Sequence, residues 1–209
     1  MNPTAATAVA YPAVPARAFT EALEQMDRTV FAIGPNDWCN PTPCAAWNVT
    51  DLLGHVVVEL SWMAPLLAGR SVAQIRGRLA GDLLGDDPIG AWERASAHAD
   101  RAVRAADAAQ LVDTSRGAIA AGEYVTEVFA DILVHTWDLA RALGTGDRLP
   151  SELVQQCAAW FAGVEEVWRS AAIIDARPPI AADHDGQTQL LAAFGRRADW
   201  RPRRSEAPR

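Results

Sequence analysis

The chain has 209 residues, half of them apolar, and a formal net charge of −7, which suit a single globular domain with a sizeable core and argue against a nucleic-acid backbone as partner. No apolar run reaches the roughly 18 residues that a membrane-spanning helix needs. All 19 basic residues are Arg, so catalysis through a lysine Schiff base or a lysine nucleophile is excluded.

The ends of the chain differ in character from its middle. Residues 1–14 lack both the positive start and the long apolar core of a signal peptide, so we expect a flexible lead-in. Residues 201–209, rich in Arg and Pro, predict a disordered tail. Between them we expect a helical bundle over residues 15–170 and an extension over residues 171–200 that packs on it. Three cysteines without a Cys-x-x-Cys spacing predict reduced thiols and a cytoplasmic protein.

The first predicted helix covers residues 15–33. Apolar side chains recur through it at helical spacing, and Gly34 and Pro35 end it. The following segment, residues 35–47, contains three prolines, which are incompatible with regular structure. Three side chains of this loop are expected to pack against the bundle and to bind nothing: Trp38, Trp47 and Cys44.

The second predicted helix begins at Asn48. The Asn48 side chain can cap it while Asp51, three residues later, reaches back in a variant of the capping box. A wide apolar stripe follows as far as Leu67, and His55 lies on its flank. A single histidine in such a place is usually a satisfied core residue. Glu59, one turn later, is either an acid on the helix surface or a base near a bound water.

Two less regular stretches flank the third predicted helix, which covers residues 88–106. Residues 69–87 are loop-rich, with glycines four apart, and are expected to form a mobile wall over a pocket. His98 has no ionisable partner in register on the helix, so we expect it on the surface. A polar loop around residues 113–116 follows. The sequence shows little strand signal anywhere.

The stretch from Gly122 to Gly144 is the predicted central helix. It is apolar on nearly all sides, which indicates that it is buried, and ionisable groups on a buried helix need partners. Asp131 and His135 are four residues apart, so a carboxylate oxygen and an imidazole nitrogen can converge on one point. That geometry suits a metal ion. The alternative is an Asp–His hydrogen bond inside the bundle.

The last long helix is predicted after Pro150 and is expected to run to Trp168, with one apolar side. A Pro-Pro turn and a short helix around residues 190–194 then belong to the extension.

Helical bundles build metal sites from facing helices. His55, Asp131 and His135 would supply two imidazoles and one carboxylate. Three protein ligands of this kind, with a fourth position open, are typical of a catalytic zinc site. Such a set leaves Zn²⁺ with residual positive charge, which favours an anion at the open position.

Two segments carry a specific resemblance. TPCAAWNVTDLLGHVV and the later DILVHTWDLARALG resemble the metal-binding domain of the mycothiol-dependent maleylpyruvate isomerase family, within the DinB-like or YfiT-like superfamily. The resemblance covers roughly residues 15–200. It implies an all-α fold, a DinB-like up-down-down-up four-helix bundle, here with a short C-terminal extension. It also implies Zn²⁺ or another divalent metal bound by His55, Asp131 and His135, and mycothiol as the cofactor thiol.

Two departures separate this chain from the isomerase. The isomerase has Glu where this chain has Asp131, and it carries a further C-terminal domain where this chain has a short extension after Trp168. Asp138 and Arg141, three residues apart, either pair with each other or serve the site, with Asp138 orienting a ligand histidine. These two residues and Glu59 are the candidate catalytic groups. The candidates for contact with the cofactor are Trp62 and Trp137.

The first functional hypothesis is therefore a cytoplasmic, zinc-dependent thiol enzyme, a mycothiol S-transferase or isomerase. Its partners would be a low-molecular-weight thiol and an electrophilic small molecule, with neither nucleic acid nor a membrane. The alternatives are a metal-dependent hydrolase, with Glu59 or Asp138 as the base for a metal-bound water, and a bundle that binds a metal or ligand without turnover. The sequence leaves the oligomeric state open, a homodimer included.

Overall fold

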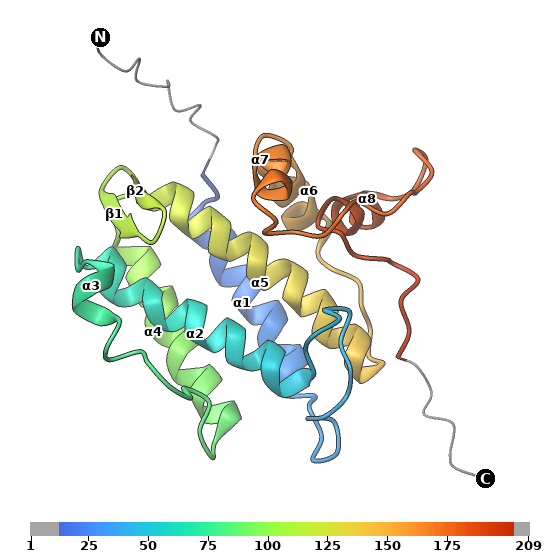
Figure 1. Ribbon diagram of the computed structural model, residues 1–209, viewed down its shortest axis with the longest axis horizontal. Helices are drawn as coiled ribbons and strands as arrows, with labels where there is room; N and C mark the ends of the chain where they lie inside the picture. Colours follow the sequence, from blue (N-terminus) through green and yellow to red (C-terminus); the bar gives the residue numbers. More distant parts are fainter. Residues whose placement is uncertain (1–12, 203–209) are drawn as a thin grey trace.

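The computed structural model describes residues 13–202, and most of this part of the chain is helical (Figure 1). Residues 1–12 and 203–209, where the flexible lead-in and most of the disordered tail were predicted, lie outside the described residues. Four long helices form the main body: α1 (Ala16–Val30), α2 (Val49–Leu67), α4 (Pro88–Ala105) and α5 (Ala121–Leu143). The shorter elements are α3 (Val72–Ile75), β1 (Leu111–Thr114), β2 (Gly117–Ala120), α6 (Ser151–Phe161), α7 (Glu165–Ser170) and α8 (Gly186–Ala193).

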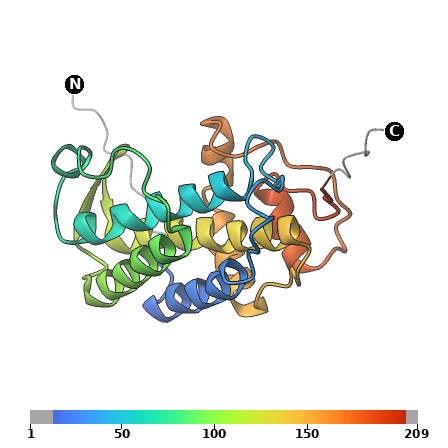
Figure 2. The same ribbon diagram turned by 90° about the horizontal axis from the view of Figure 1, so that it is seen from below.

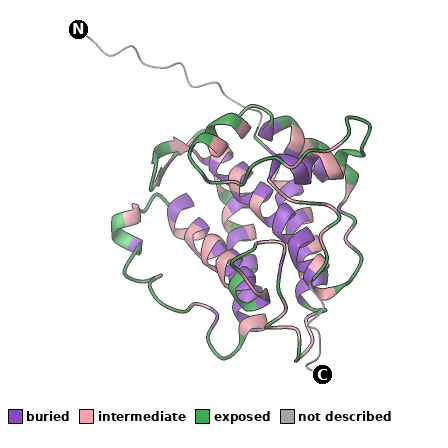
Figure 3. Ribbon diagram, turned by 45° about the vertical axis from the view of Figure 1, so that its right-hand side comes forward, coloured by how far each residue is buried: buried purple, intermediate pink, exposed green. Residues whose placement is uncertain are grey.

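The four long helices pack around one apolar core. Helix α2 packs against α4 and α5, and α1 packs against α5 and α4, so that each helix has two long neighbours (Figures 1 and 2). Helix α5 is buried almost throughout, as its sequence predicts, and it appears as a nearly continuous buried ribbon in Figure 3. The core includes several large side chains that solvent does not reach: Phe19, Met26, Trp92, Phe129, Ile132 and Trp160. Within residues 13–202, no helix combines the length and apolar character needed to cross a membrane.

The predicted start of α2 is confirmed. The Asp51 amide donates to Asn48 Oδ1 at 3.0 Å, and the Asn48 amide donates to Asp51 Oδ2 at 3.0 Å. This reciprocal pair satisfies two amides that the first turn of a helix otherwise leaves without partners. Because α2 begins at a fixed residue, His55 lies two turns in, on the side that faces α5.

A small β-hairpin replaces the predicted polar loop, so the chain expected to be all-α is mostly helical with one two-stranded sheet. Strands β1 and β2 pair antiparallel, with Val112 opposite Ile119 and Thr114 opposite Gly117. Gly117 has φ of +113°, a conformation that favours glycine, and the Thr114 hydroxyl donates to the Gly117 carbonyl at 2.6 Å. The hairpin leads directly into α5.

The last predicted helix is in fact two helices. Helix α6 ends at Phe161, and α7 begins at Glu165 after a turn that contains Gly163. The break changes the direction of the chain, so that the Trp168 ring packs at 5.6 Å against Phe161. Phe194, just after α8, stacks on Phe161 with ring centroids 3.8 Å apart and also contacts Trp168. The extension thus packs on α6 through aromatic side chains.

Candidate metal centre

Three predicted ligands meet between α2 and α5. His55 Nε2 lies 3.2 Å from Asp131 Oδ2, and His135 Nε2 lies 3.2 Å from Asp131 Oδ1. The two imidazole rings are 5.0 Å apart between centroids. Ligand atoms bound tetrahedrally at about 2.0–2.1 Å from a zinc ion are about 3.3 Å from one another. The separations to Asp131 therefore fit a divalent metal, and the donor set fits zinc.

The short distance between His135 and Asp131 requires a cation between them, which is either a metal ion or a proton. His135 Nδ1 lies 3.0 Å from Asp138 Oδ2, so a neutral imidazole donates its one proton to Asp138. Its Nε2 then faces an Asp131 oxygen without a proton between them, and two acceptors this close repel unless a cation joins them. In the metal-free protein that cation is a proton. Burial acts to lower the pKa of His135, but Asp131 and Asp138 outweigh it and hold the pKa well above its ordinary value.

The carboxyl of Asp131 responds in the opposite sense. Burial acts to raise its pKa, but the neighbouring imidazoles of His135 and His55 outweigh burial and hold the pKa far below its ordinary range. Asp131 is therefore an anion at neutral pH. A metal ion that binds between these groups competes with the proton on His135, so we expect metal binding to strengthen as the pH rises.

Behind the three ligands, Asp138 forms a buried ion pair. Its side chain is 0% exposed, and its Oδ2 accepts from Arg196 Nη2 at 3.0 Å. Burial acts to raise the pKa of Asp138, but Arg196 and His135 keep it below its ordinary value. The predicted alternative, a pair between Asp138 and Arg141, is wrong. Arg141 instead forms an ion pair with Asp147 at 2.8 Å and donates to the carbonyl of Trp200.

Cys44 lies in the same network, although the sequence suggested no base beside it. Its Sγ is 3.3 Å from Asp138 Oδ2 and 4.0 Å from His135 Nδ1. Arg196 Nη2 donates to Sγ at 3.0 Å. Cys44, His135 and Asp138 are close enough to form a second ligand set. The Arg196 guanidinium already bridges Cys44 and Asp138, however, so a metal cation would be repelled there.

Trp47 packs against the core as predicted, and it also contacts the imidazoles of the proposed site. Its ring lies 4.8 Å from the His55 ring and 5.6 Å from the His135 ring, between centroids. Trp38 likewise packs against the core as predicted. Trp47 therefore contacts both imidazoles of the proposed ligand set.

The other side of the centre opens into a cleft of about 400 Å³. His55 and Asp131 lie in its lining, together with Glu59 and Trp62. Glu59 has no hydrogen bond or ion pair with another residue in the part of the chain that the structure describes. Burial and the nearby Asp131 raise the pKa of Glu59. Trp62 is therefore placed where a cofactor could contact it, and Glu59 is a carboxyl group free to exchange a proton.

The rim of the cleft comes from the β-hairpin, which the sequence did not connect with it, and from residues 69–87, which were expected to form a wall over a pocket. Arg116, in the turn of the hairpin, forms an ion pair with Glu127 of α5 beside the cleft. Val72 and Arg76, from the segment expected to form a wall, also line it. The predicted cofactor contact through Trp137 is not supported, because this residue is 1% exposed and lies beneath the Arg141 guanidinium at 5.6 Å.

Comparisons with known proteins identify a family and a similar fold. The model of one family, described as the mycothiol maleylpyruvate isomerase N-terminal domain, matches residues 19–140. A crystal structure of the mycothiol-dependent maleylpyruvate isomerase is similar with a TM-score of 0.60 and 17% identity, over 89% of this chain and 91% of that one. The structure of a histidine-to-alanine mutant of the mycothiol-dependent maleylpyruvate isomerase gives 0.56 and 16%, over 76% and 72%. No curated protein matches the chain by sequence.

Proposed function

The chain belongs to the mycothiol maleylpyruvate isomerase N-terminal domain family, and so to enzymes of the isomerase type; we propose that it uses a divalent metal, zinc by preference, and mycothiol to act on an electrophilic small molecule. Isomerisation is the first candidate reaction and S-transfer the second. The observation that carries the proposal is the convergence of His55, Asp131 and His135 on one point at the side of an open cleft. We also assign α1, α2, α4 and α5 to the up-down-down-up bundle of this family.

In the proposed centre, the residues that bind the metal differ from the residue that transfers a proton. A divalent metal in this donor set would favour the thiolate form of a bound thiol at neutral pH. His55 and His135 offer neutral nitrogens, and Asp131 offers the charge. Asp138 holds the His135 ring with its Nε2 toward the centre, and in doing so it positions a ligand without touching a substrate.

Glu59 is the proposed proton carrier. It lines the cleft beside His55 and Asp131, it has a raised pKa, and within residues 13–202 its carboxylate forms no hydrogen bond or ion pair. A carboxyl whose pKa lies nearer to the working pH both gives and takes protons efficiently. Glu59 can therefore deliver a proton to a carbon or oxygen of the substrate and recover it. The same placement suits a base for a metal-bound water, which is why hydrolysis is the alternative reaction.

Metal binding is tested by single histidine substitutions. We expect one metal per chain, and we expect His55→Ala and His135→Ala each to lose it while keeping their helical content, because the apolar core remains. His98→Ala and His184→Ala, whose histidines are exposed outside the cleft, serve as matched controls. Metal content by plasma emission spectroscopy and far-ultraviolet circular dichroism give the two readouts. A full metal complement in both site variants would contradict the assignment.

Thiol use is tested with cobalt in place of zinc. Sulfur ligation gives cobalt an intense charge-transfer band in the near ultraviolet, so titration of the cobalt protein with mycothiol should produce this band, and mycothiol disulfide should not. A free thiol of pKa about 8.5 is mostly protonated at neutral pH, so binding should release a proton. If millimolar mycothiol gives no band while cobalt is bound, the hydrolase becomes the better hypothesis.

A further inference from the structure

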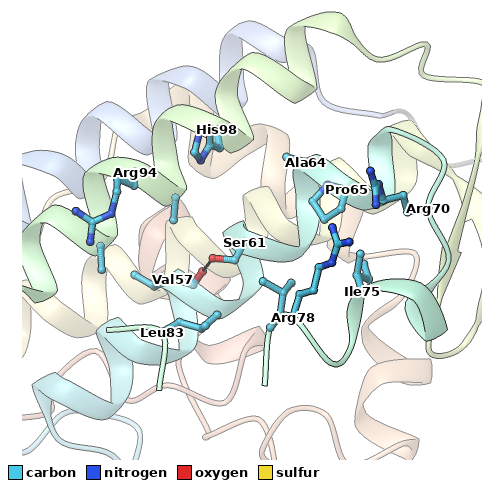
Figure 4. A pocket seen from close by; sticks show the side chains of 13 residues that line it. Val57, Ser61, Ala64, Pro65, Arg70, Ile75, Arg78, Leu83, Arg94 and His98 are labelled. Carbon is cyan, nitrogen blue, oxygen red and sulfur yellow. Dashed lines mark hydrogen bonds between the residues drawn. The ribbon is translucent and has the colours of Figure 1, made fainter. Parts of the chain in front are cut away.

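A second cavity, of about 560 Å³, lies on the other side of α2 from the cleft. Its walls come from α2, α4 and the segment between them (Figure 4). On α2, Val57 and Ser61 face this cavity, whereas His55 and Glu59 face the cleft. Residues two apart on a helix point about 200° away from each other, so the two hollows occupy opposite faces of one helix. The cavity is therefore separate from the proposed metal centre.

The apolar lining of this cavity is entirely aliphatic. It contains no aromatic side chain other than the imidazole of His98, and its apolar lining residues include Val57, Pro65, Ile75, Leu79 and Leu83. Its volume is within the roughly 300–1,000 Å³ that is usual for small-molecule sites. Such a lining favours a flexible hydrocarbon chain and offers no ring on which a flat aromatic ligand could stack.

The charged lining residues are all cationic, although the whole chain carries a net charge of −7. They are Arg70, Arg78 and Arg94, without an acidic residue among them. Neither Arg70 nor Arg78 has a hydrogen bond or ion pair from its guanidinium to any residue within 13–202. Arg94 has one exposed contact with Asp87 at 3.4 Å, and such pairs contribute little.

Two of these arginines, Arg70 and Arg78, point toward the same end of the cavity. Figure 4 shows Arg70 and Arg78 pointing toward each other beside Pro65, with Arg94 away at the far end. Two unpaired cations that face each other repel, and an anion between them relieves the repulsion. The Ser61 hydroxyl, near the middle, already donates to the Val57 carbonyl at 2.6 Å. Recognition of a charged group therefore falls to the arginines.

We propose that this cavity binds an aliphatic carboxylate, such as a medium-chain fatty acid. Its head group lies between Arg70 and Arg78, where planar guanidinium groups can hold a carboxylate through two hydrogen bonds each. Its hydrocarbon chain runs over the aliphatic lining toward Arg94. This proposal does not depend on the metal centre, and the metal centre does not depend on it.

Calorimetric titration with sodium decanoate, below its micelle-forming concentration, tests the charge recognition. The protein is treated with a chelator first, so that the carboxylate cannot bind a metal in the cleft. Arg70→Gln and Arg78→Gln should each weaken decanoate binding by about tenfold or more, because each removes charge-assisted hydrogen bonds. Arg101→Gln, an exposed arginine of α4 that lines neither hollow, should bind decanoate like the parent.

The hydrocarbon part is tested separately. Decanamide, which keeps the chain and loses the charge, should bind about tenfold more weakly than decanoate, and Ala64→Leu, which fills part of the lining, should weaken binding of decanoate. These results, together with the loss in the two arginine variants, support the proposal. Absence of decanoate binding at millimolar concentration would overturn it. So would equal affinity in the parent, Arg70→Gln and Arg78→Gln.

Discussion

At the scale of single residues, Asp138 connects the proposed metal centre to the rest of the molecule. It accepts from His135 Nδ1 on one side and from Arg196 on the other, with no exposure to solvent. A buried carboxylate of this kind is tolerated only while its counter-charge is present. The orientation of one proposed metal ligand therefore depends on an arginine in the extension.

Replacement of Arg196 should be costly for this reason. Arg196→Met removes the guanidinium that neutralises the buried carboxylate of Asp138, and we expect a loss of about 3–5 kcal/mol in the free energy of unfolding. Arg196→Met/Asp138→Asn removes the buried carboxylate together with its counter-charge, so much of the loss should be recovered. Urea denaturation of the metal-free proteins measures both. Arg197→Met, whose side chain is 69% exposed, is the control. A loss no greater than that of Arg197→Met would contradict this account.

The pH dependence of the free energy of unfolding should report the environment of Glu59. Burial and Asp131 raise its pKa in the folded protein above the ordinary 4.5, so folding favours the protonated carboxyl. The stability that this protonated form gives is fully present below pH 4.5. The contribution is lost as the pH rises through the folded pKa. Glu59→Gln should thus be more stable than the parent at pH 7, with a difference that narrows toward pH 4.5. Denaturation of chelator-treated protein across this range tests it, with the exposed Glu24→Gln as control. A difference independent of pH would refute the charge explanation.

At the scale of elements, the sequence predicted the helices with long apolar repeats and clear ends. The starts of α2 and α4 and the burial of α5 follow from local signals, namely Asn48, Pro88 and the apolar circumference of residues 122–144. The hairpin was missed because its strands have four residues each, too few for alternation to be recognised. The break after Phe161 was missed because the apolar spacing continues across it and tertiary packing of Trp168 decides the direction.

The capping box at the start of α2 allows a test of how much a local sequence signal contributes to the free energy of unfolding. Asn48→Ala removes the acceptor for the Asp51 amide, and we expect it to lower the free energy of unfolding by about 1 kcal/mol. Asn48→Asp keeps an acceptor oxygen at the same place and should remain close to the parent. Thermal or urea denaturation distinguishes the two. Equal losses in both variants would show that the cap does not act through this hydrogen bond.

At the scale of the whole molecule, the site could be predicted only where its residues are close in sequence or resemble a family motif. Asp131 and His135 were predicted from their spacing, and His55 from its place on a second buried helix and from the resemblance. Cys44 and Arg196, separated by 152 residues, carry no local pattern that connects them. Their meeting depends on the way the extension packs on the bundle, which no periodicity of the sequence specifies.

Metal binding should be visible as a change in global stability. A ligand that binds only the folded protein at 100 times its Kd adds about 2.7 kcal/mol, so zinc should raise the Tm. Because the pKa of His135 is raised, a proton competes with zinc, and the shift in Tm should be larger at pH 8 than at pH 6. Differential scanning fluorimetry with His135→Ala as control measures it. A shift that is equal at both values, or equal in His135→Ala, would contradict the proposed competition.

The pair between Arg196 and Asp138 also determines when, during synthesis of the chain, this part of the site can be completed. A ribosome makes the chain from its N-terminus, and Asp138 is synthesised 58 residues before the guanidinium that neutralises it. Helix α5 can form and collapse with α1, α2 and α4 during that interval, as early segments of nascent chains do. Its buried carboxylate must meanwhile remain hydrated or keep a proton. The orientation of His135 by an ionised Asp138 is therefore completed only after nearly all of the described chain has been synthesised.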